Sequence, residues 1–165
     1  MTERGGISAS VPDWSRERTR AGEWSPGKKL LASIRDYQRY RGLGRKLAVL
    51  RHRFWSAVSG ADIPINSQIG GGLLIPHPNG IVIHPDARIG PNCLLFQQVT
   101  IGDANGLPTI GGHVDVGAGA KILGAIHIGD HARIGANAVV LADVPAGATV
   151  VGIPARLVEP RQQAD

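Results

Sequence analysis

Residues 121–140 read KILGAIHIGDHARIGANAVV, and an aliphatic side chain returns at every sixth position of this stretch. An α-helix has a period near 3.6 residues and an exposed strand has a period of two, so neither explains a sustained period of six. A solenoid does explain it, because each hexad then forms one flat side and three hexads complete a coil of about 18 residues. The stretch therefore predicts a β-helix.

The same period extends over the chain from residue 63 onward. We expect the inward positions to be Ile63, Ile69, Ile75, Ile83, Ile89, Leu95, Ile101, Ile110, Val116, Ile122, Ile128, Ile134 and Val140, with Ala146 closing the register. Positions four residues further on are also small or aliphatic. With coils stacked about 4.8 Å apart, these hexads predict a rod about 20–25 Å long.

The remaining segments differ from the rod in pattern. Residues 1–26 combine Ser, Gly, Pro, Arg and Glu without an apolar period, which predicts a disordered tail. Residues 27–59 carry apolar side chains three to four apart, which predicts two helices that cap the open end of the rod. We assign residues 60–158 to the β-helix and residues 159–165 to a C-terminal tail.

Composition limits the class of protein. The net charge of +5 comes from the N-terminal third of the chain. Such a basic segment would attract an anionic membrane surface or nucleic acid, but basic helix faces are more often simply solvated. We therefore expect no nucleic-acid partner and no stable membrane insertion. The sequence lacks an apolar run of about 18 residues and a signal-peptide pattern, which predicts a cytoplasmic protein. The single cysteine, Cys93, excludes an internal disulfide and a multi-cysteine zinc site.

Two irregularities interrupt the hexads, and insertions in a solenoid are where chemistry is commonly placed. One is the step from Ile75 to Ile83, which contains PHPNG, and the other is the step from Ile101 to Ile110, which contains GDANGLPT. We expect the two insertions to border one cleft. His77 faces outward in a turn stiffened by prolines, so it is the candidate general base.

The other candidate groups carry less weight. His84 also points outward, but in a regular hexad. Cys93 occupies an inward position, which indicates a buried hydrophobe and not a nucleophile. A zinc-dependent solenoid enzyme is an alternative, but His127 and His131 do not supply the spacing of its ligands, so we expect no metal.

From about residue 39 to residue 160 the chain resembles the serine acetyltransferase branch of the hexapeptide-repeat acyltransferases. The matching text is SGADIPINSQIGGGLLIPHPNGIVI, then VTIG, then VGAGAKILGAIHIGDHARIGANAVVLADVPAGATVVGIPARLV. The resemblance implies a left-handed parallel β-helix, a homotrimer with active sites between subunits, and acetyl-CoA as co-substrate. The resemblance also implies that His77 is the general base and that Asp62 is the carboxylate that orients it. It further implies a CoA site at Ala118, Gly119, Ala136 and Arg156.

The chain departs from the serine-using pattern of that family. Pro76 and Pro85 stand where the family has acidic residues, and Leu107 stands where it has a second active-site histidine. Because a partly buried ammonium needs a carboxylate partner, these departures favour a sugar or surface-polysaccharide hydroxyl as acceptor. L-Serine is the alternative acceptor, and a non-catalytic trimeric scaffold is the alternative of another class.

Overall fold

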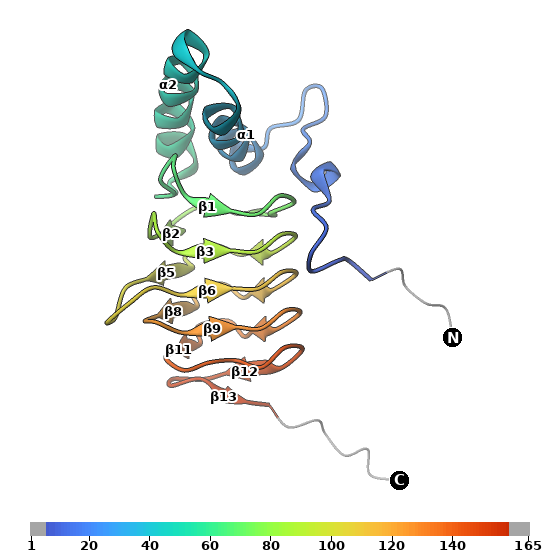
Figure 1. The fold of residues 1–165 in the computed structure, drawn as a ribbon, viewed down its shortest axis with the longest axis vertical. Coiled ribbons are helices and arrows are strands. Elements are labelled where there is room, and N and C mark those ends of the chain that lie inside the picture. The colour runs from blue at the N-terminus through green and yellow to red at the C-terminus, as the bar shows by residue number, and fades with distance from the viewer. Residues whose placement is uncertain (1–5, 159–165) are drawn as a thin grey trace.

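A computed structural model describes residues 6–158 and shows a β-solenoid with two helices at its N-terminal end (Figure 1). The strands form three sheets, which are the three faces of the coil. This confirms the β-helix that the hexad period predicts. The predicted C-terminal tail, 159–165, and residues 1–5 of the predicted disordered tail lie outside the described residues.

Each face is a stack of short strands. The first face consists of β1 (Gln68–Ile69), β3 (Arg88–Ile89), β6 (Thr109–Ile110) and β9 (His127–Ile128). The second consists of β4 (Leu94–Leu95), β7 (Asp115–Val116), β10 (Arg133–Ile134), β12 (Thr149–Val151) and β13 (Arg156–Leu157). The third consists of β2 (Val82–Ile83), β5 (Thr100–Gly102), β8 (Lys121–Leu123) and β11 (Val139–Val140). All neighbours pair in parallel except β13, which is antiparallel to β12.

Strand pairing shows the coil length and both insertions. Val82 pairs with Thr100, and Lys121 pairs with Val139, so these coils have the regular length that three hexads give. Asp62 bridges to Val82, and Thr100 pairs with Lys121, so a longer stretch of chain separates the partners in these two coils. The two longer coils are those that contain PHPNG and GDANGLPT, so the insertions leave the stacking of the strands intact.

The core follows the predicted register up to the last coil. All thirteen predicted positions from Ile63 to Val140 are buried. Ala146, predicted to close the register, is instead exposed in a turn. The reason is that the last coil is shorter than three full hexads, since Ile128 already bridges to Val144. Val144 is consequently buried in place of Ala146.

Helices α1 (Pro26–Arg39) and α2 (Gly42–Ser59) lie at the N-terminal end of the rod (Figure 1). Leu30, Leu31 and Ile34 of α1 are fully buried in the same apolar cluster as the first coil. Burial of each such side chain stabilises the fold by about 2 kcal/mol. Helix α1 therefore closes the end of the core. No helix within residues 6–158 is long and apolar enough to cross a membrane.

Helix α2 keeps an apolar face exposed. Five large apolar side chains three or four residues apart form this face, which we call the α2 stripe: Leu43, Leu47, Leu50, Phe54 and Val58. The rest of the exposed helix surface is basic, and α2 contains no Asp or Glu. In the single chain the helix thus contacts the rest of the protein through its opposite side only.

Residues 6–25 are ordered, so the disorder predicted for residues 1–26 is wrong over this part of the chain. They run along the rod and contain a short 3-10 helix, η1 (Trp14–Glu17) (Figure 1). The buried amide of Asn92 holds the segment, because its Oδ1 accepts from the Asp13 N–H at 2.7 Å and its Nδ2 donates to the carbonyls of Ser8 and Val11 at 2.7 and 2.8 Å.

A second anchor holds the end of this segment. Glu17 pairs with Arg35 of α1 at 2.8 Å and accepts from the backbone N–H groups of Gly72 and Leu73. Composition predicted disorder because the segment has few apolar residues to bury. It is ordered because its polar groups bind the backbone and side chains of the rod.

Candidate active site

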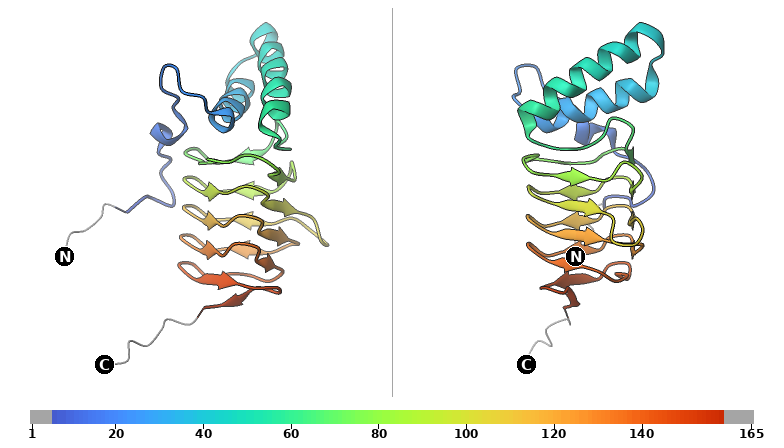
Figure 2. Two further views of the ribbon diagram at one scale, coloured as in Figure 1. Left: turned by 180° about the vertical axis from the view of Figure 1, so that it is seen from behind. Right: turned by 90° about the vertical axis from the view of Figure 1, so that its left-hand side faces the viewer.

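The turns between the second and third faces stack into one edge of the rod, which we call the second corner (Figure 2). Its first four turns are residues 76–80, 96–98, 117–119 and 135–137. A fifth turn, 152–155, continues the stack but joins β12 to the antiparallel β13 of the same second face. Backbone hydrogen bonds of 2.8–2.9 Å join successive turns, from Gln98 N–H to Asn79, from Gly119 N–H to Gln97 and from Asn137 N–H to Ala118. Side chains at this corner therefore form a line along the rod.

His77 lies in the first turn of the second corner. Its imidazole is exposed, between the exposed Pro76 and the buried Pro78. The turn closes at Gly80, whose positive φ of 68° is favoured by glycine. An exposed imidazole held on a stiff turn can accept a proton from a hydroxyl that approaches from outside the rod.

Asp62 lies at the start of the third face, on the coil next to that turn. Its backbone N–H donates to Ile81 at 2.8 Å, and its carbonyl accepts from Ile83 at 2.9 Å. The nearby Gly80 N–H donates to the carbonyl of Gly60, so the two chain segments are adjacent. The exposed Asp62 and the exposed His77 thus lie on adjacent chain segments. Within residues 6–158 no hydrogen bond joins their side chains.

The residues predicted to bind CoA follow His77 along the second corner. Ala118 and Gly119 occupy its third turn and Ala136 its fourth, while Arg156 is exposed just beyond the fifth. Tight stacking explains some of the small residues without any ligand. A Cβ on Gly119 would lie 2.1 Å from the Asn137 amide oxygen, and its φ is +73°. Among the small residues Gly119 is accordingly required by the fold itself.

The second insertion lies elsewhere on the rod. Residues 103–108 form a projecting loop between β5 and β6, at the corner between the third and first faces (Figures 1 and 2). The Asp103 carboxylate accepts from the Gly106 N–H at 2.7 Å and stabilises the loop. We expected this loop and His77 to border one cleft, which is wrong for a single chain. The third face separates them because the two insertions fall on different turns of the coil.

The other two candidate residues from the sequence, Cys93 and His84, have structural roles. Cys93 is completely buried, and burial raises the pKa of its thiol to about 11, so the thiolate needed for nucleophilic chemistry is not formed. His84 accepts from the Asp86 N–H through Nδ1 at 3.2 Å, which stabilises a regular turn. No group of three or more His, Cys, Asp or Glu residues within 6–158 has the arrangement of a metal site.

Sequence reasoning missed the contact between two histidines. The Nδ1 atoms of His113 and His131 are 2.8 Å apart on neighbouring coils. Burial lowers the pKa of His113, His131 lowers it further, and Asp115 opposes the shift. The signal was present in the sequence, because residues separated by one regular coil occupy the same place in successive coils.

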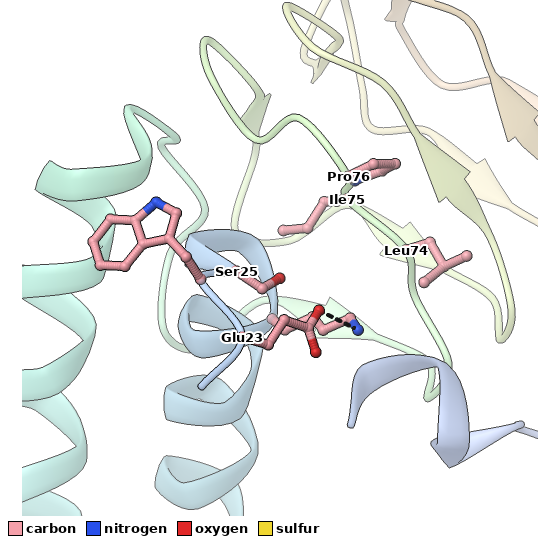
Figure 3. A pocket seen from close by; sticks show the side chains of 7 residues that line it. Glu23, Ser25, Leu74, Ile75 and Pro76 are labelled. Carbon is pink, nitrogen blue, oxygen red and sulfur yellow. Dashed lines mark hydrogen bonds and ion pairs between the residues drawn. The ribbon is translucent and has the colours of Figure 1, made fainter. Parts of the chain in front are cut away.

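A cavity of about 360 Å³ was also missed. It lies between the segment that leads into α1 and the start of the second face, and is lined by Glu23, Trp24, Ser25, Lys28, Leu74, Ile75 and Pro76. Figure 3 shows Glu23 and Ser25 across the cavity from Leu74, Ile75 and Pro76. Sequence reasoning could not find the cavity because one wall belongs to the tail predicted to be disordered. Pro76 directly precedes His77, so the cavity adjoins the second corner.

No protein-family model matches the chain. A serine acetyltransferase of Helicobacter pylori strain J99 is 42% identical to it over 133 residues, which cover 78% of this chain and 75% of that relative. The chain belongs to the serine acetyltransferase-like branch of the hexapeptide-repeat acyltransferases. The sequence resemblance to this branch is therefore confirmed.

Two further comparisons agree with this membership. A serine acetyltransferase of Synechococcus elongatus is 45% identical over 106 residues, which cover 61% of this chain and 43% of that relative. A serine acetyltransferase solved in complex with CoA is 36% identical, with a TM-score of 0.72, and the match covers 82% of this chain and 58% of that one. The chain thus spans about half the length of these two relatives.

Proposed function

We propose that the protein transfers the acetyl group of acetyl-CoA to the hydroxyl of L-serine. The observation that carries the proposal is the second corner, where the exposed His77 stands at one end of a line of small residues. Membership of the family supports the reaction class. The names of the relatives support serine as the acceptor, since all three are serine acetyltransferases.

The proposed reaction needs one proton carrier. His77 takes the hydroxyl proton as the acceptor oxygen forms a bond to the thioester carbonyl carbon. The tetrahedral intermediate then collapses, the carbon–sulfur bond breaks, and the imidazolium returns its proton to the CoA sulfur. Backbone N–H groups stabilise the oxyanion. The products are the acetyl ester and CoA, and no covalent intermediate on the protein is required.

Other residues of the corner have supporting roles in the proposal. Asp62 orients the imidazole and stabilises its cationic form, which requires the two side chains to come into contact. The pantetheine arm lies along Ala118, Gly119 and Ala136, because small side chains let it approach the backbone. Arg156 lies near the phosphates, where its exposed guanidinium supplies a positive charge.

The identity of the acceptor is tested by comparing L-serine directly with sugars. The sequence favoured a sugar hydroxyl, because Pro76, Pro85 and Leu107 replace polar groups of the family, whereas the relatives favour serine. Purified protein is incubated with acetyl-CoA and either L-serine or a panel of sugars and nucleotide sugars, and release of CoA thiol is measured. We expect turnover with L-serine. Turnover with a sugar and none with L-serine would overturn our choice of acceptor.

The non-catalytic scaffold makes a different prediction. A transferase must bind its donor, so calorimetric titration with CoA is expected to show saturable binding. Absence of CoA binding together with absence of acetyl transfer would favour the scaffold.

We propose a homotrimer as the working assembly. Two features of the single chain support it, namely the uncovered α2 stripe and the projecting loop 103–108. The third face keeps this loop away from His77 of its own chain, so a neighbouring copy has to supply any loop that covers the second corner. In this proposal the active site lies between two subunits.

A further inference from the structure

The cavity beside the second corner has a charged wall and an apolar wall. The Glu23 carboxylate accepts from the Lys28 ammonium at 2.9 Å and from the Arg20 N–H at 2.8 Å (Figure 3). Leu74, Ile75 and Pro76 form the opposite wall. A cavity of about 360 Å³ is within the range of small-molecule sites, and a few polar groups on an apolar background are typical of them.

Both charged side chains are held in place and remain reachable. The side chain of Lys28 is 27% exposed and that of Glu23 is 30% exposed. The hydrogen bond from the Arg20 backbone, followed by that from Lys28, lowers the pKa of Glu23, so the group is a carboxylate near neutral pH. The cavity wall therefore presents one negative and one positive charge side by side.

Such a pair is complementary to a zwitterion. An α-amino acid carries an ammonium and a carboxylate on one carbon, and placed against Glu23 and Lys28 it completes a square of alternating charges. Ligands with only one of these groups would satisfy only one of the two side chains. The chemistry thus selects a small amino acid over an uncharged sugar.

We propose that this cavity binds the amino-acid acceptor, with Glu23 contacting its ammonium and Lys28 its carboxylate. The inference rests on the proposed function and names residues that determine its specificity. It also answers the difficulty raised by the departures from the family, because Glu23 supplies the carboxylate that Pro76 and Pro85 do not. Pro76 lines the cavity and directly precedes His77, so the proposal places the acceptor hydroxyl beside the general base.

Isothermal titration tests the proposal with three ligands, each with and without CoA. L-Serine carries both charges, L-glycerate lacks the ammonium, and serinol lacks the carboxylate. We expect the full chain to bind L-serine more tightly than either analogue. Glu23→Gln should reduce the preference over L-glycerate, and Lys28→Gln the preference over serinol, each by about tenfold, the size of a lost charge-assisted hydrogen bond.

Matched controls separate this effect from a general loss of stability. Lys29→Gln removes a neighbouring charge that does not line the cavity. Asp36→Asn breaks another ion pair of α1, which joins Asp36 to Arg51 of α2. Both should bind like the unaltered protein. Leu74→Trp narrows the cavity without changing charge, so it should weaken the three ligands alike. Melting temperatures and CoA affinity confirm that each variant is folded.

The outcomes distinguish this inference from the proposed reaction. Equal binding of the three ligands by the unaltered protein, or unchanged ligand preferences in Glu23→Gln and Lys28→Gln, would overturn the assignment of the cavity, even if L-serine is acetylated. Charge-selective binding of L-serine without any acetylation would support the cavity and reject the transferase.

Discussion

A single exposed imidazole, His77, carries the proposed proton transfer. His77→Ala should lower the rate of acetyl transfer by roughly 10²- to 10⁴-fold, the usual contribution of a general base. CoA affinity and melting temperature should hardly change, because the side chain is exposed. Asp62→Asn should lower the rate less, since Asp62 orients the base without transferring the proton. The measurement is the initial rate of thiol release at saturating acetyl-CoA.

The matched control for His77 is the histidine of the second His-Pro pair. His84→Ala loses one hydrogen bond to a turn and should retain near-native turnover. If His84→Ala proved more damaging than His77→Ala, the base would be wrongly assigned.

At the same scale, the pair of His113 and His131 couples stability to pH. Burial and the neighbouring His131 lower the pKa of His113, so the unfolded chain binds its proton more readily than the folded one. The stability that neutral His113 contributes is therefore present above its ordinary pKa of about 6.5 and is lost as pH falls through the lowered value.

His113→Asn tests this coupling. Asn tolerates the positive φ of 52° at this position and does not titrate. We expect the melting temperature of the variant to fall less than that of the unaltered protein between pH 7 and pH 5. His127→Asn, at an exposed strand position, serves as control, and an equal fall in all three proteins would reject the coupling.

At the scale of elements, Asn92 ties the N-terminal segment to the rod. Asn92→Gly keeps the positive φ of 62° possible but removes three hydrogen bonds to residues 8–13. We expect the free energy of unfolding to fall by about 2 kcal/mol, at somewhat under 1 kcal/mol for each bond. Urea denaturation measures the loss.

Release of the N-terminal segment from the rod can also be measured locally, by proteolysis. Trypsin should cut Asn92→Gly faster at Arg16 and Arg18, which the contacts protect in the unaltered chain. Asn137→Gly, at the same kind of turn with a φ of 57°, is the control, because the N-terminal segment is held by Asn92. Equal cutting of the two variants would show that Asn92 does not hold the segment.

At the scale of the whole molecule, the α2 stripe is expected to become buried on assembly. Replacing Leu47 and Leu50 by Asp introduces two charges at the centre of this face, which an apolar interface does not tolerate. Sedimentation velocity should show a trimer for the unaltered protein and a smaller species for the double variant. Leu141→Asp, on an exposed part of the rod, should remain trimeric. A monomeric unaltered protein would reject the trimer.

The sequence by itself determined the rod. Each hexad carries its own inward side chain, so a local repeat is sufficient to predict the coil, its faces and the buried positions. It also located both insertions and so the turn that bears His77. It failed at Ala146, because a shorter last coil shifts the register without breaking the aliphatic pattern.

Only the tertiary structure decided the surroundings of the candidate site. The N-terminal segment is ordered by polar contacts between residues far apart in the chain, such as Asp13 with Asn92 and Glu17 with Gly72, and no local pattern encodes them. The cavity beside Pro76 exists only because this segment folds back onto the rod. The separation of loop 103–108 from His77 likewise depends on which turn of the coil each insertion occupies, since a corner is a property of the closed coil and not of a single hexad.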